Sequence, residues 1–169
     1  MSSTTPVITT GLIAAAGQRR LLDGPLGALL ALPAEASEGR LSVVIHDIAP
    51  RTLGAPIHTH RNEYEYSYVL DGLIGVQVGD RDYEARAGDT VAKPRGIPHA
   101  FWNPTDHPAR FVEIITPGGF QEYFPGVGAA FGPDGPDFAA LAAVAARFEL
   151  AVDFASIPML VERHGLRLG

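Results

Sequence analysis

The amino-acid sequence predicts an all-β fold, either a sandwich or a barrel, followed by a short helical extension at the C-terminus. Three observations support this prediction. Short apolar runs, separated by Gly, Pro, Asn and Asp, fill residues 41–117. Their spacing favours short strands joined by turns over strand–helix–strand units. After residue 117 the pattern becomes helical, and the whole chain of 169 residues has the length of one domain.

The apolar runs of the central part predict eight strands. Gly79-Asp80 is typical of a two-residue hairpin turn, and the Asn-Pro-Thr-Asp sequence at residues 103–106 indicates another turn. The predicted strands cover residues 41–48, 57–60, 64–70, 74–78, 83–86, 90–93, 99–103 and 110–116.

The flanking segments are expected to support this central barrel without forming further domains. Residues 1–40 are predicted to be strands and coil that lead into the barrel of residues 41–117. Residues 118–169 are predicted to form a helical tail that packs on the barrel. This assignment leaves one domain with a single core.

Capping residues predict where the helices of the tail begin and end. A short helix is predicted over residues 120–124. Asp137 is expected to cap a second helix over about residues 138–150. Ser156 is expected to cap the last helix, which should end near Gly165 because glycine readily adopts the left-handed conformation there.

Composition excludes several classes of protein. The chain has no cysteine, which removes disulfides, thiolate zinc sites, thiol nucleophiles and iron–sulfur clusters. With 13 basic and 19 acidic residues the net charge is −6, so nucleic acid is not an expected partner. No apolar run approaches the ~20 residues that span a bilayer. Residues 7–17 lack the preceding positive charge of a signal peptide. We therefore expect a cytoplasmic protein without membrane contact.

Two histidines form the start of a candidate metal site. His58 and His60 are two positions apart, so their side chains share one face of a strand. Such a pair alone also occurs on protein surfaces. Glu65 follows after a short turn and competes with Glu63 for a place beside them, and His99 lies on a later strand. Three imidazoles and one carboxylate suit Fe, Mn, Ni, Cu or Zn as divalent ions, with positions left for water or substrate.

These two stretches resemble the two sequence motifs of the cupin superfamily. The first motif, His-x-His-x4-Glu-x6-Gly, is matched by His58, His60, Glu65 and Gly72. The second motif, Gly-x5-Pro-x-Gly-x2-His-x3-Asn, is matched by Gly88, Pro94, Gly96, His99 and Asn103. The usual Gly five residues before the first His is absent. The short gap between the motifs resembles that of small bacterial monocupins, and the start of the tail resembles quercetin-dioxygenase-like cupins.

The resemblance implies a double-stranded β-helix, which is a small jelly-roll barrel. It implies a divalent transition metal held by His58, His60, Glu65 and His99, and a small-molecule substrate. The motif spacing assigns the ligand role to Glu65, so Glu63 is expected at the surface or the rim. Because cupins commonly dimerise by packing sheet on sheet, the resemblance also implies a homodimer.

Strand parity predicts which side chains surround the metal. If Glu65 points inward, Ser67 and Val69 also point inward, and the small Ser67 leaves room beside the metal. The opposite face would carry an apolar stripe that is a candidate dimer interface, formed by Tyr66, Tyr68 and Leu70.

The strand of the third histidine adds two further pocket residues. If His99 points inward, so do Phe101 and Asn103. Phe101 would then give the pocket an apolar wall suited to a flat or aromatic ligand. The alternative is that Phe101 and Val69 only fill the barrel interior.

Other polar residues are expected to play smaller parts. His46 could line the pocket or face solvent, and we favour a structural role. Glu113 lies among apolar residues, so it is either exposed or a pocket acid. Arg95 is expected to be a solvated charge near the rim. His107 is expected to be exposed in a turn, and His164 to lie at a helix C-terminus, where its charge suits the helix dipole.

Three functions remain open at the level of sequence. The first is a metal-dependent dioxygenase that acts on a flavonol-like, other aromatic or enediol substrate, with Glu65 as ligand and catalytic base. The second is a lyase, isomerase or cyclase in which the metal acts as a Lewis acid without redox chemistry. The third is a ligand-binding module without catalysis. The sequence fixes neither the metal nor the substrate.

Overall fold

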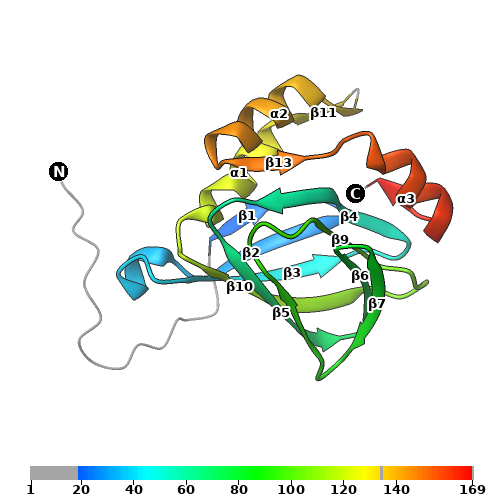
Figure 1. Cartoon of the computed structure of the whole chain (residues 1–169), viewed down its shortest axis with the longest axis horizontal. Coiled ribbons are helices and arrows are strands. Elements are labelled where there is room, and N and C mark those ends of the chain that lie inside the picture. The colour runs from blue at the N-terminus through cyan, green and yellow to red at the C-terminus, as the bar shows by residue number, and fades with distance from the viewer. Residues whose placement is uncertain (1–18, 134, 169) are drawn as a thin grey trace.

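The computed structural model describes residues 19–133 and 135–168 of the chain. The predictions for residues 1–18, including the stretch 7–17, fall outside the described residues. The described chain forms two β-sheets that face each other, and the helices after residue 122 (yellow to red) lie on one side of them (Figure 1). Apolar side chains from both sheets meet in one core between them, formed by Ile48, Val69, Ile74, Val76, Ala85, Phe101, Ala109 and Phe111.

The first sheet has the strand order β1-β2-β3-β10-β5-β8. All of its neighbouring strands are antiparallel. Along β3, β5 and β10 buried and more exposed residues alternate, as expected for strands with one face on a core. The strands are β1 (Arg20–Leu22), β2 (Leu26–Leu32), β3 (Ser42–Ile48), β5 (Tyr64–Asp71), β8 (Thr90–Lys93) and β10 (Ala109–Thr116).

The second sheet has the strand order β13-β4-β9-β6-β7, and β14 also pairs with β4. The pairing of β14 with β4 is parallel and the others are antiparallel. The strands are β4 (Thr52–His60), β6 (Leu73–Val78), β7 (Arg81–Arg86), β9 (His99–Trp102), β13 (Leu150–Val152) and β14 (Arg167–Leu168).

All eight predicted strands are present, and the largest difference in their ends is at β4. This strand begins at Thr52, whereas residues 57–60 were predicted. Pro56, which lies inside the observed strand, cannot donate a backbone hydrogen bond. The strand accommodates Pro56 through two register shifts against β9, one between Leu53 and Ala55 and one between Ala55 and His58.

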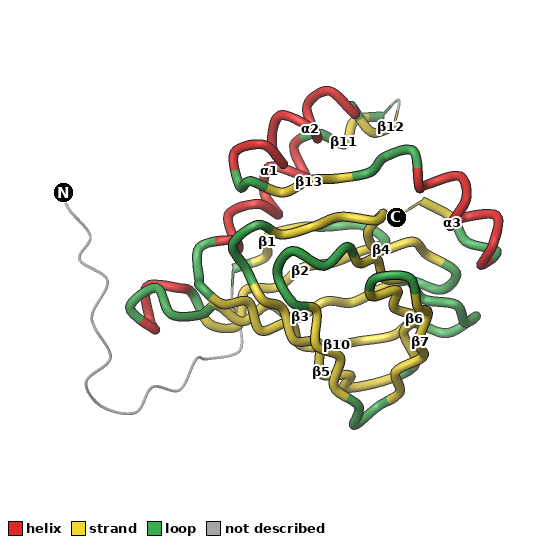
Figure 2. The backbone as a smooth tube through the Cα atoms, in the orientation of Figure 1, coloured by secondary structure: helices red, strands yellow, loops and turns green. Residues whose placement is uncertain are grey.

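Both flanking segments contribute strands to the sheets (Figure 2). Before the predicted barrel of residues 41–117, β1 and β2 extend the first sheet. After it, β13 and β14 pair with β4 in the second sheet, so the tail is not helical throughout. The remaining elements are two 3-10 helices, η1 (Ala34–Ser37) and η2 (Phe120–Glu122), three α-helices, α1 (Tyr123–Ala129), α2 (Phe138–Arg147) and α3 (Ser156–His164), and the hairpin β11 (Phe131–Gly132) to β12 (Gly135–Pro136).

The caps of the tail helices agree in part with prediction. Asp137 caps α2, because its Oδ1 accepts hydrogen bonds from two backbone N–H groups of the first turn at 3.0 Å each. Gly165 ends α3 with φ of 63°. The predicted cap Ser156 is instead the first residue of α3. Its hydroxyl accepts a hydrogen bond from the Ile57 backbone N–H at 3.0 Å and donates one to the Asp153 carbonyl at 2.6 Å, which ties the helix to β4.

The first part of the tail closes one end of the space between the sheets. Its aromatic residues pack into a second apolar cluster with β1, β2, β3 and β10. Helix α3 packs on the outer side of β4 and β9 through Leu160, which is fully buried. In the described part of the chain, no helix is long and apolar enough to cross a membrane.

Candidate metal centre

Strand β4 places two histidines on the inner face of the second sheet. The side chains of His58 and His60 point the same way because they are two positions apart, and both are buried, with 8% and 1% of their surface exposed. The register between β4 and β9 pairs His58 with His99, which is also fully buried. Sheet pairing therefore brings the third predicted histidine beside the first.

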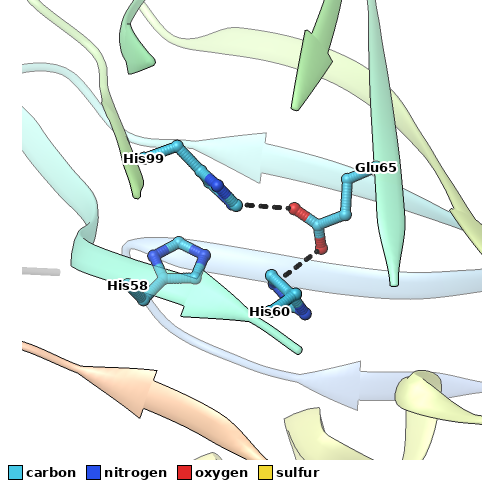
Figure 3. Close-up of side chains that lie close together, drawn as sticks. All are labelled: His58, His60, Glu65 and His99. Carbon is cyan, nitrogen blue, oxygen red and sulfur yellow. Dashed lines mark ion pairs between the residues drawn. The ribbon is translucent and has the colours of Figure 1, made fainter. Parts of the chain in front are cut away.

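Glu65 reaches the same point from β5 of the opposite sheet. Its Oε1 lies 3.4 Å from His60 Nε2, and its Oε2 lies 3.3 Å from His99 Nε2. One ligand atom from each of His58, His60, Glu65 and His99 lies within 4.8 Å of the others. Figure 3 shows the four side chains converging on one space. The structure thus brings together all four residues that were predicted as metal ligands.

The hydrogen bonds of the histidine rings fit a metal site. Each Nδ1 lies beside a carbonyl or carboxylate oxygen, so a neutral ring with its hydrogen on Nδ1 would leave the Nε2 lone pair for a metal. The acceptors are the Pro56 carbonyl for His58 at 2.8 Å, a Glu63 carboxylate oxygen for His60 at 3.2 Å, and the Ile97 carbonyl for His99 at 3.0 Å.

The Nε2 atoms of His60 and His99 are buried and have no hydrogen-bond partner within the described residues. Buried polar atoms without partners are costly, and three imidazole nitrogens with one carboxylate are a suitable donor set for a divalent transition metal. The residues present therefore fit a bound metal ion.

The position of Glu63 differs from the prediction of a surface or rim residue. Its side chain is buried, with 9% of the residue surface exposed, and it orients the His60 ring. A carboxylate behind a ligating imidazole fixes the tautomer and increases the basicity of the ring. The spacing of three residues between His60 and Glu63 is a signal in the sequence that could have suggested this contact.

Burial keeps the imidazoles of His58 and His99 neutral. It lowers the pKa of His58 well below its usual value, with further lowering from His99 and His60. Burial also lowers the pKa of His99. Burial alone would raise the pKa of Glu65, but the charge of Lys93 and the contacts with His60 and His99 hold it well below its usual range. His58, His99 and Glu65 are therefore in the protonation states that bind metal ions.

A lysine that the sequence analysis did not single out lies directly beside this cluster. Lys93 is 1% exposed, and its Nζ lies 3.0 Å from Glu65 Oε2 and 2.6 Å from Glu113 Oε2. Burial would lower the pKa of Lys93, but the two carboxylates outweigh it and the pKa is raised. Lys93 pairs with Glu65 across β5 and β8, and it is the only lysine of the chain.

Glu113 is a buried acid of the barrel interior. It faces inward from β10 with 2% of its surface exposed. Of the two predicted positions, exposed or inside the pocket, the structure therefore shows the inner one. Burial raises the pKa of Glu113 to about 7. Ser67 points inward as predicted, but its hydroxyl donates to both Glu113 oxygens, at 3.2 and 3.0 Å, and is not free to face a ligand.

A cavity of about 120 Å³ opens onto three of the four clustered residues, His58, His60 and Glu65. Its walls are mainly apolar and include many residues of the tail. Glu113 and His46 also line it, although His46 was expected to be structural. The tail residues at the wall are Phe120, Tyr123, Phe124, Val127, Phe131, Pro136, Phe138, Leu141, Leu150, Val152, Phe154, Ile157 and Leu168.

Of the four predicted pocket residues only Phe101 lines this cavity. Its ring lies against Gly54, where a Cβ atom would be 2.2 Å from a ring carbon. Val69 packs in the core between the sheets. The Asn103 side chain donates to the carbonyls of Ile48 at 3.2 Å and His107 at 2.7 Å. The prediction that Ser67, Val69 and Asn103 line the pocket is corrected by these contacts.

The remaining predicted residues lie away from the cavity. His107 is exposed in its turn, as expected. His164 lies at the end of α3, where its ring stacks on Trp102 with 4.0 Å between the centroids. Arg95 is exposed and lies over the Tyr64 ring. Among the described residues, no lysine or arginine lines the cavity.

Comparison with protein families gives one decisive match. Residues 44–115 match the family model described as a cupin domain. The chain contains a cupin domain. Within it, Gly72 of the first motif has a positive φ of 74°, and a Cβ atom there would lie 2.8 Å from the Pro108 carbonyl oxygen. That close approach accounts for the motif glycine, and the match confirms the double-stranded β-helix expected from the sequence.

Solved structures of other cupins are similar in fold. A protein described as a predicted oxalate decarboxylase from Thermotoga maritima is 19% identical, with a TM-score of 0.56 over 62% of this chain and 98% of its own. KdgF from a Halomonas species is 14% identical, with a TM-score of 0.57 over 65% and 96%.

A sugar phosphate isomerase of the cupin superfamily from Silicibacter pomeroyi is 24% identical over 54% of this chain, with a TM-score of 0.49. This chain spans only 59% of that relative. No curated protein sequence gave a significant match. At their identities, the similarity to the Thermotoga maritima and Halomonas proteins shows the fold alone.

Proposed function

We propose that this cupin is a metal-dependent dioxygenase for a small, largely apolar substrate with oxygen donors, such as a one-ring phenol or an enediol. The observation that carries the proposal is the apolar cavity that opens directly onto the three-histidine, one-glutamate cluster. Its volume of about 120 Å³ is on the order of the ~150 Å³ apolar cavity known to hold benzene.

The charges around the cavity favour a substrate without an anionic group. A phosphate or an oxalate dianion would need cationic or other strong donors in the wall in addition to the metal itself. Within the described residues the wall contains no lysine or arginine, and the nearby Lys93 is paired with two carboxylates. The aromatic walls instead suit a flat ring.

Residues of the chain would then bind, orient and deprotonate the substrate. A bound redox-active metal would supply Lewis acidity and reactivity toward O₂. His58, His60, Glu65 and His99 would hold it, with Glu63 orienting the His60 ring. Glu65 is held ionised and faces the cavity, so it can also take the proton of a substrate hydroxyl. Apolar residues of the tail would exclude water from the reacting groups.

The test is oxygen uptake by the purified protein loaded separately with Fe(II), Mn(II), Ni(II), Cu(II) or Zn(II). Catechol and a simple enediol serve as probes. We expect uptake with at least one redox-active metal, with loss after chelation and in His99→Ala. The matched control is His107→Ala, which removes an exposed histidine. Metal-loaded protein that consumes no O₂ with either probe would contradict the proposal.

A second candidate function is lyase, isomerase or cyclase chemistry without O₂. It is favoured by Glu113, which lines the cavity and has a pKa raised to about 7 by burial. An acid with a pKa near neutrality can both donate and accept a proton during turnover. Turnover under argon, or full activity with Zn(II), would select this function. Probe binding without turnover in any condition would instead select a non-catalytic ligand-binding role.

We also propose that the protein acts as a cytoplasmic homodimer. Tyr66, Tyr68 and Leu70 are 38%, 43% and 44% exposed on the outer face of β5, as parity predicted. On the neighbouring strand, Ile114 lies opposite Tyr66 and Val112 lies opposite Tyr68, and both are half-buried. A second copy packed on this apolar face would bury it.

A further inference from the structure

His46 lies on the wall of the cavity and is not part of the metal cluster. It belongs to β3 in the first sheet, is 2% exposed and lines the cavity, but it is not one of the four clustered residues. Its ring is surrounded by aromatic rings, with centroid distances of 6.3 Å to Phe101, 5.0 Å to Phe111 and 5.2 Å to Phe124. It is therefore a polar group set in an aromatic wall.

One hydrogen bond fixes the tautomer of His46. Its Nδ1 lies 3.1 Å from the Gly27 carbonyl oxygen, which can only accept, so Nδ1 carries the hydrogen. Burial lowers the pKa of His46 to about 4, so the ring is neutral near pH 7. Nε2 is consequently a hydrogen-bond acceptor.

The acceptor at His46 Nε2 has no hydrogen-bond partner among the described residues. The His46 side chain lines the cavity. An acceptor without a partner in an aromatic wall is costly unless a ligand supplies a donor.

We propose that His46 Nε2 is a ligand-binding subsite that accepts a hydrogen bond from a hydroxyl of a one-ring aromatic substrate. This hydroxyl is distinct from the oxygen that would bind the metal, so the preferred substrates carry two separated oxygen donors. The inference rests on the proposed function and deepens it, because it assigns the end of the substrate that lies away from the metal. His46 is a specificity residue in this assignment.

The test compares phenol with toluene, which have the same size but differ in the hydroxyl donor. Affinities for the metal-free full-length protein are measured by titration, and the quantity of interest is the ratio of the toluene Kd to the phenol Kd. We expect His46→Phe to lower this ratio about five- to tenfold, the value of one hydrogen bond. His46→Gln keeps an acceptor and should retain most of the ratio. The exposed-histidine control His107→Phe should leave it unchanged.

An unchanged ratio in His46→Phe would overturn the subsite. Should this variant fail to fold, ¹⁵N NMR of the wild type provides the second measurement. We expect the His46 Nε2 resonance to have the shift of an unprotonated nitrogen and to move on addition of phenol but not of toluene. A resonance that stays in place would also overturn the proposal. Because no metal or O₂ is present, failure of the subsite is distinguishable from failure of the oxygen-uptake assay.

Discussion

Lys93 and Glu113 form a 2.6 Å ion pair inside the barrel, with 1% and 3% of their side chains exposed. The same ammonium group lies 3.0 Å from Glu65, so one cation is shared by two carboxylates. When both carboxylates are ionised, the three groups together have one uncompensated negative charge, which a divalent cation beside Glu65 would offset. The ion pair thus sets the electrostatic environment of the candidate metal centre from outside its ligand set.

We expect Lys93→Met to lower the free energy of unfolding of the metal-free protein by about 3–5 kcal/mol, because it leaves two buried carboxylates without their cation. The double variant Lys93→Met with Glu113→Gln should lose much less than the sum of the two single losses. Urea unfolding of the wild type, the two single variants and the double variant gives the four free energies of unfolding. Arg51→Met, which breaks an exposed pair with Asp106, should change the stability little. Additive losses in the double variant would show that the pair is not energetically coupled.

Glu63→Ala should weaken metal binding by about 10- to 100-fold, since the His60 ring would lose the carboxylate that orients it. Competition with a chromophoric chelator measures the affinity. Glu84→Ala removes an exposed glutamate and serves as the matched control. Equal metal affinities in Glu63→Ala and Glu84→Ala would contradict this role of Glu63.

The buried neutral His46 makes the stability of the protein depend on pH. Its pKa is lowered from 6.5 to about 4 on folding, so the unfolded chain binds more protons between these values. The stabilisation is fully present above pH 6.5 and is lost as the pH falls toward 4, by about 3 kcal/mol. Urea unfolding of the metal-free protein at pH 7 and pH 4 should therefore show a smaller acid loss in His46→Phe than in the wild type. Part of the loss should remain, because the pKa values of His58 and His99 are lowered as well. Equal acid losses would contradict the buried, neutral state.

Tyr68→Asp should shift the protein from dimer to monomer, because it places a charge in the proposed interface on β5. Tyr83 is 48% exposed on β7 of the other sheet, so Tyr83→Asp is the matched control and should remain dimeric. Sedimentation velocity distinguishes the species. A wild-type protein that sediments as a monomer at all concentrations would end the dimer proposal.

The four clustered residues could be predicted from one local signal and from the resemblance to the two cupin motifs. Two histidines at i and i+2 share a face, and the motif spacing supplied Glu65 and His99. The strands could be predicted because alternation and turn residues act over a few positions. The start of β4 was missed because two register shifts compensate for Pro56, and such compensation depends on β9.

Contacts across the barrel could not be read from the chain. Parity placed Ser67 inward correctly, but parity does not say that Glu113 would take its hydroxyl from a strand 46 positions away in sequence. The same holds for Lys93, whose charge is tolerated inside only because two carboxylates meet it there. Asn103 was predicted to line a pocket, whereas its amide satisfies the backbone of the following turn.

The pairing of the tail with β4 has a consequence for solubility. Strand β4 has β9 on one side, and on the other side β13 pairs with residues 58–60 and β14 with residues 52–53. Without these two short strands, the backbone donors and acceptors beside His58 and His60 would form an open sheet edge, which is a template for pairing with another chain. Natural proteins protect such sheet edges from pairing that leads to aggregation. The last twenty residues therefore line the cavity and also protect β4 from intermolecular β-pairing. This strand carries two of the candidate ligands.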